Sequence, residues 1–553
     1  MSRTTVRTIA DKYVAALATT SPSAAEALGQ VPEILVPDLS PQAAHARNDL
    51  QRRTLHALRD VPAEGAERVL AVAMRERLAS DLALDDVGFT PRLLAPLATP
   101  VHQVRQVFDN LPTGDRAEVD RVLANLERVP TAYAQYREAL TAAAADGHVV
   151  PSRQARIVAQ QCRTWIDPAG ADYYTALADR AAEHARDAGA VRRAAEAATT
   201  ATAEMADWLE HTHAKLGSEQ DGVGIDFYEV TSKALLGTEV DLEETYAYGW
   251  ARLARLTREV QQVSRRITGG SGGLAEATAT LDADGLRVPV GPPLVDWIQQ
   301  RIQASVDAVD GTVFDLPDAA RHCEGRLSTP GSGVIYYSPP DIARTRPGRV
   351  YWSTPPDAET MPVWREVSTV HHEGVPGHHL QYAISMSQPD LHPWQRYLCH
   401  VHGYAEGWAH YAEGRAESWG LVHDDADRLS VLLAQRWRAA RIVIDIGLHL
   451  DLPIPPGNGV TRRRRWTRTS AREVLVQVSA LDAHTATFEV DRYLGWPGQA
   501  LAFCVGARLW EQALTQSRAV GGANFTEKGF HMTALQLGPM GLGPLQTLLT
   551  EQV

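Results

Sequence analysis

The segment 371–379 constrains this chain more than any other, because it places four histidines and a glutamate within nine residues, HHEGVPGHH. A second polar segment, EGWAHYAE at residues 406–413, lies in a stretch that we expect to be helical from 404 to 419. Imidazole nitrogens and carboxylate oxygens are the ligands that zinc takes in hydrolytic enzymes, where one coordination position stays open. The sequence therefore predicts a fold in which these two segments meet and bind one Zn²⁺ per chain.

The spacing of the histidines departs from the common zinc-binding motif H-E-x-x-H, in which two histidines share one helix face and the glutamate acts as base. Here the fourth position after His372 is Pro376, which cannot bind a metal ion. Proline removes a backbone donor and crowds the preceding turn, so we expect a distorted helix. If the distortion loops out two residues, His378 is the second ligand, whereas an unbroken helix would present His379. We favour His378 and keep His379 as the alternative.

The other members of the predicted site are acidic. Glu373 adjoins the first ligand and is the candidate general base, which takes a proton from the attacking water and passes it to the leaving group. Glu406 is the candidate third ligand. Glu413 shares its helix face and either orients a ligand histidine or is an ordinary solvent-facing carboxylate.

Further candidates lie downstream. Tyr493, His449 and His531 are residue types that can hydrogen-bond the oxyanion formed when water attacks a carbonyl, and we place Tyr493 in the catalytic set. Arg492 can bind a substrate carboxylate through two parallel hydrogen bonds. Each has a structural alternative, such as core packing for Tyr493, pairing with a neighbouring acid for Arg492, and packing at a helix end for His449.

The composition of the chain limits which binding partners and which cellular compartment we expect. The net charge of −13 argues against a nucleic-acid or anionic-membrane partner, and we expect the basic run Arg462–Arg465 to be a solvated loop. No apolar stretch is long enough for a transmembrane helix, and the first residues are charged throughout. We therefore expect a cytoplasmic protein with free thiols. The four cysteines are far apart and form no metal-binding pair: Cys162, Cys323, Cys399 and Cys504.

Strong helix formers dominate the first part of the chain. Residues 117–145 and 172–216 favour helix, and prolines punctuate the region. We expect residues 1–220 to form a helical scaffold and residues 221–553 to form the catalytic region, the two joined in one continuous compact unit.

Two segments in the second part predict strands. Residues 333–338 and 349–353 are β-branched and aromatic and are bounded by proline and glycine. The predicted fold class is therefore mainly α, a large helical metallopeptidase-like fold with a small β-sheet beside the metal-binding helix. A strand edge of that sheet can hold an extended peptide through main-chain hydrogen bonds.

Several blocks of sequence carry a resemblance to a known family. They are GIDFYEVTSKALLGTEVDLEETYAYG (224–249), GVIYYSPPD (333–341), HHEGVPGHHLQY (371–382), HGYAEGWAHYAEG (402–414), AARIVIDIGLH (439–449), FEVDRYLGWPGQALAFCVG (488–506) and FHMTALQLGPMGLGPL (530–545). In these blocks the chain resembles the bacterial domain of unknown function 885 family, which groups with gluzincin-type zinc metallopeptidases. The resemblance covers about residues 220–553, and the region before it matches only in helical character and length.

The resemblance implies a mainly helical metallohydrolase in which His372, His378 and Glu406 bind zinc and Glu373 is the base. The string EGWA is also similar to the Glu-Gly-Phe-Ala of gluzincin aminopeptidases, where that glutamate binds the metal. By analogy of fold, the expected activity is hydrolysis of peptide bonds in short peptides. The alternatives are a metal-dependent amidase acting on a non-peptide metabolite and a non-catalytic metal-binding relative.

Overall fold

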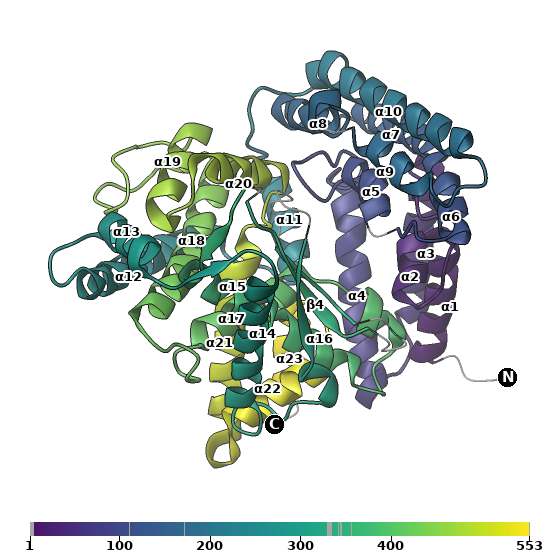
Figure 1. The fold of residues 1–553 in the computed structure, drawn as a ribbon. Helices are drawn as coiled ribbons and strands as arrows, with labels where there is room; N and C mark the ends of the chain where they lie inside the picture. Colours follow the sequence, from purple (N-terminus) through teal and green to yellow (C-terminus); the bar gives the residue numbers. More distant parts are fainter. Residues whose placement is uncertain are drawn as a thin grey trace. The chain divides into compact units, whose positions relative to one another are not determined.

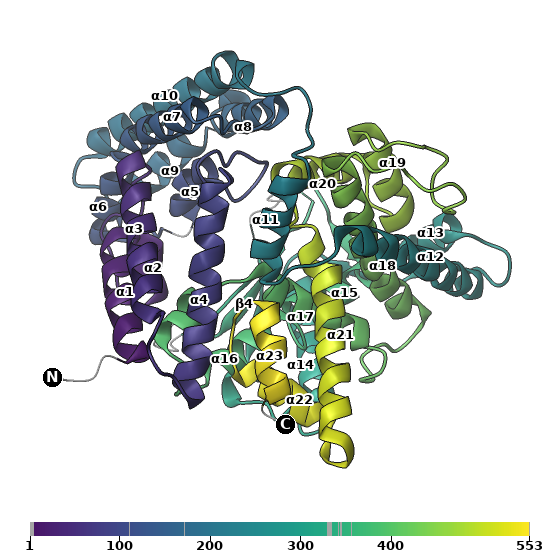
Figure 2. The same cartoon turned by 180° about the vertical axis from the view of Figure 1, so that it is seen from behind.

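The chain divides into two compact units. The computed structural model describes residues 5–109, 111–170, 172–328, 335–340, 342, 346–355 and 357–551. Unit 1 comprises Met1–Val61, Leu78–Val230 and Thr487–Pro497, and unit 2 comprises Pro62–Arg77, Thr231–Ala486 and Gly498–Val553. The predicted boundary at residue 220 lies close to Val230, where the longest segment of unit 1 ends. Figures 1 and 2 show the course of the chain from opposite sides.

The described part of unit 1 is helical. Its elements are α1 (Val6–Thr20), α2 (Pro22–Ala27), α3 (Pro41–Leu58), α5 (Pro100–Gln106), η1 (Val107–Asp109), α6 (Arg116–Leu126), α7 (Val129–Ala145), α8 (Ser152–Trp165), η2 (Pro168–Gly170), α9 (Tyr173–Ala181), α10 (Ala188–His211) and η3 (His213–Lys215). The boundaries between the units fall within or beside three further helices, α4 (Gly65–Asp86), α11 (Ile225–Leu236) and α20 (Ala483–Gly495).

Local signals explain where the helices of unit 1 begin. Asp115 caps α6 by accepting a hydrogen bond from the backbone of Glu118, and the Glu118 side chain bonds back to the cap. Pro130 stands in the first turn of α7, where its missing N–H costs no helical hydrogen bond. Helix α10 packs against α7, α8 and α9. The core between them contains the fully buried rings of Tyr133 and Tyr174.

Unit 2 combines helices with two small sheets. Its helices are α12 (Leu242–Ile267), α13 (Leu274–Asp284), α14 (Pro292–Val309), η4 (Asp318–Ala320), η5 (Val363–Glu366), α15 (Val367–Glu373), α16 (His378–Met386), η6 (Trp394–Leu398), α17 (His402–Arg415), α18 (Asp425–His449), α19 (Arg468–Ser479), α21 (Leu501–Gly521), η7 (Gly522–Asn524), α22 (Glu527–Gln536) and α23 (Leu542–Glu551). Its strands are β1 (Arg287–Pro289), β2 (Cys323–Leu327), β3 (Tyr336–Ser338), β4 (Gly348–Trp352) and β5 (Thr360–Pro362).

The larger sheet has the order β2-β4-β3, with β4 parallel to β2 and antiparallel to β3. The smaller sheet pairs β1 with β5 in antiparallel fashion. Strands β3 and β4 cover the two predicted segments, except that residues 333 and 334 lie outside the described residues. Because β4 packs against α16, the predicted mainly α fold with a small sheet beside the histidine-bearing helix is confirmed.

Two helix crossings in unit 2 depend on glycine. Helices α17 and α21 run side by side (Figure 2), and a Cβ on Gly407 would lie 2.7 Å from the backbone of Gly506. Helices α12 and α18 likewise cross at Gly249, whose added Cβ would lie 2.8 Å from Val443. Real Cβ atoms do not approach other atoms this closely, so the glycines allow the helices to pack and fix the position of α17.

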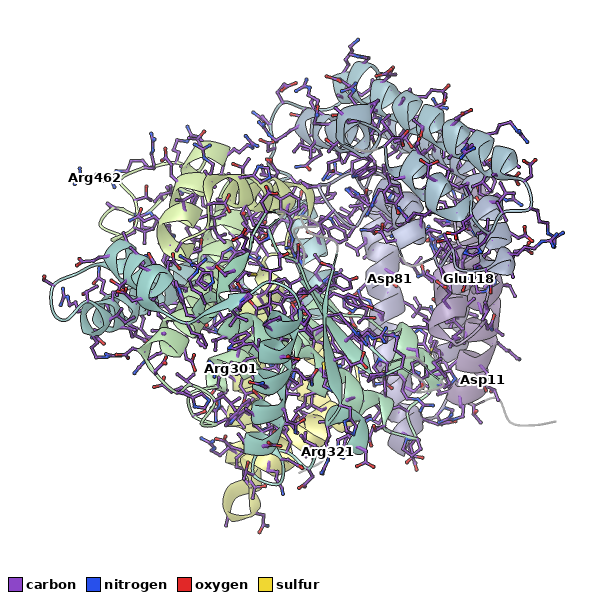
Figure 3. The ribbon with its side chains drawn as sticks, viewed as in Figure 1. Asp11, Asp81, Glu118, Arg301, Arg321 and Arg462 are labelled. Carbon is purple, nitrogen blue, oxygen red and sulfur yellow. The ribbon has the colours of Figure 1, made fainter. Side chains whose placement is uncertain are left out.

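The structure also bears on the predictions from composition. The four cysteines are free and buried, as predicted. Residues Arg462–Arg465 are exposed, Arg463 pairs with Glu473, and Figure 3 shows Arg462 pointing away from the neighbouring helices. Among the described residues, each helix is too short or too polar to span a bilayer.

Candidate metal centre

The helix that carries the first histidines breaks at the predicted place. Residues Gly374–Gly377 separate α15 from α16, and the Val375–Pro376 peptide bond is cis. The loop folds back onto the end of α15, because a Cβ on Gly377 would lie 1.9 Å from the carbonyl oxygen of His372. The indole Nε1 of Trp408 in α17 donates a hydrogen bond to the Pro376 carbonyl over 3.1 Å. This anchored loop turns the start of α16 toward the end of α15.

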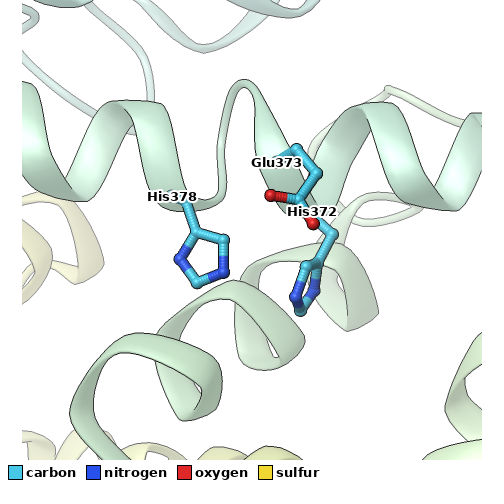
Figure 4. A group of neighbouring side chains, drawn as sticks. All are labelled: His372, Glu373 and His378. Carbon is cyan, nitrogen blue, oxygen red and sulfur yellow. The ribbon is translucent and has the colours of Figure 1, made fainter. Parts of the chain in front are cut away.

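Two histidines of these helices converge on one carboxylate oxygen. His372 Nε2 lies 3.3 Å from Glu406 Oε2, and His378 Nε2 lies 3.5 Å from the same atom. One ligand atom each of His372, Glu373 and His378 lies within 4.8 Å of the others. Figure 4 shows the two imidazole rings beside each other under the loop, with Glu373 next to His372. The four side chains therefore form one cluster, drawn from α15, α16 and α17.

The distances in this cluster fit a metal ion better than hydrogen bonds. An N–H···O bond is usually about 2.9–3.0 Å long, so contacts of 3.3 and 3.5 Å are weak ones. A tetrahedral zinc ion with bonds of about 2.0–2.1 Å holds its ligand atoms about 3.4 Å apart. Two imidazoles and one carboxylate also match the zinc ligand set that leaves one position open. His372, His378 and Glu406 could therefore hold such an ion.

The pKa shifts of the side chains in the cluster also favour a cation. Burial alone would lower the pKa of His372, but the carboxylates of Glu406 and Glu413 outweigh it and raise that pKa to about 9. Burial alone would raise the pKa of Glu406, but His372 and His378 hold it well below its ordinary value. A positive charge on these atoms is thus favoured, whether carried by protons or by a cation.

Glu373 differs from the other two acids. Burial raises its pKa above the ordinary value, and the nearby His378 and His372 offset only part of that rise. The residue is half-buried, and one of its carboxylate oxygens lies within 4.8 Å of a ring nitrogen of both His372 and His378. A carboxylate with a raised pKa beside a possible cation site can take up a proton more readily than a solvent-exposed one.

Glu413 lies beneath the cluster and is fully buried, so it is not a solvent-facing carboxylate. Its Oε2 atom lies 3.2 Å from His372 Nδ1 and accepts a hydrogen bond from Ser368 Oγ over 3.2 Å. Its Oε1 atom accepts hydrogen bonds from His410 Nδ1 and from Gln435 Nε2. Burial opposes ionisation, but His410 and His372 keep the pKa of Glu413 well below its ordinary value. The carboxylate therefore fixes the ring of His372 with Nε2 facing Glu406.

His379, the alternative ligand, lies outside the cluster. Its Nδ1 is 3.0 Å from the Tyr337 hydroxyl, and its Nε2 is 3.1 Å from the Ala320 carbonyl oxygen. Burial lowers the pKa of His379 to about 4. Both ring nitrogens are thus engaged by neutral groups, and the residue joins α16 to β3.

Two further histidines that the sequence singled out have other partners. His531 Nε2 lies 2.9 Å from the Tyr411 hydroxyl, within a group of aromatic rings that includes Trp408. Burial lowers the pKa of His531 to about 3. His449 lies at the end of α18 with Nε2 3.5 Å from Asp445 Oδ1. The contacts described for His531 and His449 are with groups outside the cluster of His372, Glu373, His378 and Glu406.

Tyr493 and Arg492 belong to unit 1. The Tyr493 hydroxyl is buried and donates a hydrogen bond to Glu489 Oε2 over 2.8 Å. One guanidinium nitrogen of Arg492 lies 3.3 Å from Glu489 Oε1. These contacts match the structural alternatives given by the sequence, which were a tyrosine packed in the core and an arginine paired with a neighbouring acid.

A family model described as Bacterial protein of unknown function (DUF885) matches residues 22–549. The chain belongs to the DUF885 family. The predicted resemblance is confirmed, and the match extends through the N-terminal region, where the sequence showed only helical character. No curated protein matches this DUF885 chain.

Solved structures share the fold of this DUF885 protein. A "putative lipoprotein" from Colwellia psychrerythraea has a TM-score of 0.81 at 18% identity, over 99% of this chain and 98% of that one. A "putative lipoprotein of unknown function" from Shewanella oneidensis has a TM-score of 0.71 at 15% identity, over 99% of this chain and 100% of that one. A "putative oligoendopeptidase F" from Bacillus anthracis str. Ames reaches a TM-score of only 0.30 at 10% identity, over 92% of this chain and 95% of that one, which does not show a shared fold.

The structure adds a residue that the sequence did not single out. Tyr382 follows His378 by one helical turn of α16, so the two side chains share a face. Among the described residues, none hydrogen-bonds its hydroxyl. Burial and the charge of Glu406 raise the pKa of Tyr382 to about 12, so the hydroxyl keeps its proton at neutral pH. The spacing of four residues from His378 is the signal that could have identified it.

Proposed function

We propose that this DUF885 protein is a zinc-dependent hydrolase of amide bonds that acts on short peptides. The observation that carries the proposal is the convergence of two imidazole Nε2 atoms on Glu406 Oε2 at distances of 3.3 and 3.5 Å. These distances suit the edges of a tetrahedral zinc site, and Glu373 adjoins it.

A zinc ion bound there would polarise an amide carbonyl and favour the deprotonation of water at neutral pH. Glu373 receives the proton from the attacking water, which its raised pKa favours, and delivers it to the leaving nitrogen. Glu413 holds the ring of His372 in place throughout, since its Oε2 lies 3.2 Å from His372 Nδ1.

Tyr382 supplies a hydrogen bond to the oxygen of the substrate carbonyl as negative charge develops on it. Its support is its place one turn after His378, together with a hydroxyl that keeps its proton and has no partner among the described residues.

The sheet beside α16 supports a peptide substrate. Strand β3 is an edge strand, and its Tyr337 contacts His379, the residue after the proposed ligand His378. An exposed strand edge can bind an extended peptide through main-chain hydrogen bonds. A short strand of three residues offers few such bonds, which suits short substrates.

The test compares wild-type protein with Glu373→Gln in metal content and in hydrolysis of a panel of short peptides. Glu373→Gln should keep its zinc and lose roughly 10²–10⁴-fold in kcat, because the base is gone while the ligands remain. Glu366→Gln is the matched control, since Glu366 is an acid of η5 whose pKa burial raises to about 7. An active Glu373→Gln variant would refute the role of this base. Zinc-loaded wild-type protein that cleaves no peptide but cleaves another amide would move the proposal to a non-peptide amidase.

A further inference from the structure

A cavity lies in unit 2 among α12, α17, α18 and α21. Its volume is about 800 Å³, and none of the proposed metal ligands is among its lining residues. His410, Gln435 and Arg252 contribute polar groups to the lining, and Tyr248 and Cys504 contribute to its sides. The cavity is therefore distinct from the candidate metal centre.

Nitrogen atoms of three residues at this cavity have no hydrogen-bond partner within the part of the chain that the structure describes. One is Nε of Arg415, whose terminal nitrogen pairs with Glu527. The other two are Nε2 of His410, a residue that is only 1% exposed, and Nε of Arg252. Gln435 connects the two residues: its amide oxygen accepts a hydrogen bond from Arg252 over 3.0 Å, and its amide nitrogen donates to the His410 carbonyl oxygen over 3.1 Å. Buried polar atoms without partners are rare in native proteins, so both atoms require an explanation.

The two atoms offer opposite hydrogen-bonding roles. Glu413 is ionised and can only accept, so His410 Nδ1 donates its proton to that carboxylate. The neutral imidazole then presents a lone pair at Nε2, which accepts a hydrogen bond. Burial lowers the pKa of His410 to about 4, consistent with a neutral ring. Arg252 can only donate.

Arg252 also carries a positive charge that its described partner does not balance. The other arginines at this cavity each pair with a carboxylate. These pairs are Arg255 with Glu259, Arg415 with Glu527, and Arg508 with Glu244. The described hydrogen bond of Arg252, in contrast, is to the neutral amide of Gln435. The cavity thus combines an unbalanced cation with a buried acceptor.

We propose that this cavity binds a small molecule that carries a carboxylate and a neighbouring N–H or O–H donor, such as a free α-amino acid. The carboxylate pairs with the guanidinium of Arg252, and the donor reaches Nε2 of His410. A guanidinium binds a carboxylate through parallel hydrogen bonds, which explains why an arginine stands there. The inference does not rest on the proposed hydrolysis, because none of its residues is a proposed metal ligand, base or oxyanion donor.

Calorimetry with L-alanine, L-lactate, acetate and methylammonium as probes tests the proposal on the intact metal-loaded protein. L-Alanine and L-lactate should bind, acetate should bind at least tenfold more weakly because it lacks the donor, and methylammonium should not bind. Arg252→Gln should weaken the binding of L-alanine at least tenfold. Arg255→Gln should leave it unchanged, because Arg255 lines the same cavity but pairs with Glu259.

A second variant guards against a misfolded protein. Arg252→Lys keeps the charge but loses the parallel hydrogen bonds, so it should bind L-alanine more weakly than wild type and more tightly than Arg252→Gln. Circular dichroism checks that both variants fold. A crystal grown with L-alanine should show the ligand between Arg252 and His410. Equal binding by wild type and folded Arg252→Gln would overturn the proposal, because the ligand would then occupy another site, such as the metal centre. Absence of binding at millimolar concentrations would also overturn it.

Discussion

Two buried histidines, one in each unit, show how partners rather than burial decide what a buried side chain can do. His102 in unit 1 is 5% exposed and His372 in unit 2 is 4% exposed. Thr99 and Gln161 bond the ring nitrogens of His102, and burial lowers its pKa to about 4. His372 lies between Glu406 and Glu413, which raise its pKa to about 9.

The difference separates a structural histidine from a candidate ligand. Neutral partners satisfy His102 completely, so the group stabilises the helices around it and offers nothing further. The carboxylates around His372 leave negative charge that needs a cation, because a buried uncompensated charge is costly. A search for metal sites in related chains should therefore weigh the partners of a buried histidine above its depth.

The largest expected effect comes from removing each of these histidines. His372→Ala should lose the metal and reduce hydrolysis to background, because one of three ligands is gone. His102→Ala should keep both, and it should lower the free energy of unfolding by about 1–3 kcal/mol because Thr99 and Gln161 lose their partner. Elemental analysis and urea unfolding measure the two outcomes. A full equivalent of zinc in His372→Ala would remove that residue from the ligand set.

The next effect separates two tyrosines whose hydroxyls differ in their hydrogen-bond partners. Tyr382→Phe should lower kcat by about 10²-fold with little change in KM, because its hydroxyl is proposed to act only as charge develops. Tyr136→Phe in unit 1 is the control, since its hydroxyl donates to the Leu93 carbonyl and should affect stability alone. Steady-state kinetics on one peptide substrate decide the point. An unchanged kcat in Tyr382→Phe would assign the oxyanion to another donor.

A smaller effect is expected from the acid beneath the cluster. Glu413→Gln should weaken metal binding by roughly 10–100-fold, because the carboxylate that orients His372 becomes a neutral amide. Glu366→Gln should bind metal as the wild type does. Competition with a chromogenic chelator measures both affinities. Equal affinities would mean that Glu413 serves packing and not the metal.

The smallest effect is a pH dependence carried by His102. Its folded pKa of about 4 lies below the ordinary value of 6.5, so its stabilising contribution is present above pH 6.5 and is lost as the pH falls toward 4. The loss is at most about 1.4 kcal/mol per pH unit. Urea unfolding of wild type and His102→Gln should therefore show a stability difference that shrinks between pH 7 and pH 4. A constant difference across that range would contradict the assignment.

Sequence reasoning succeeded where the signal was local. The proline at position 376 predicted the break between α15 and α16. Helix formers predicted helix over residues 117–145 and 172–216, where α6, α7, α9 and α10 lie. The sequence blocks that carry the family resemblance are also short, continuous segments. Strand β2, with the sequence CEGRL, was missed because it lacks β-branched and aromatic residues. Its pairing with β4 and its packing on α14 determine its conformation, and neither can be read from the segment itself.

The residues of the site could be predicted from the sequence, but the contacts that hold them in place could not. The histidines and acids stand in two short motifs, so their types and spacing could be recognised. The bond between Gln435 and Glu413 joins residues of different helices, and Ser368 reaches the same carboxylate from α15. Such contacts follow from the packing of helices, which local sequence does not encode. The catalytic role of Tyr493 stays a prediction.

The central claim is that His372, His378 and Glu406 hold a zinc ion, and X-ray absorption at the zinc K-edge of the purified protein tests it most directly. The account predicts one zinc per chain with nitrogen and oxygen ligands at about 2.0–2.1 Å and the scattering signature of two imidazoles. His378→Ala should abolish that spectrum, and His379→Ala should preserve it. Sulfur ligands at about 2.3 Å, or protein that takes up no zinc, would contradict the account.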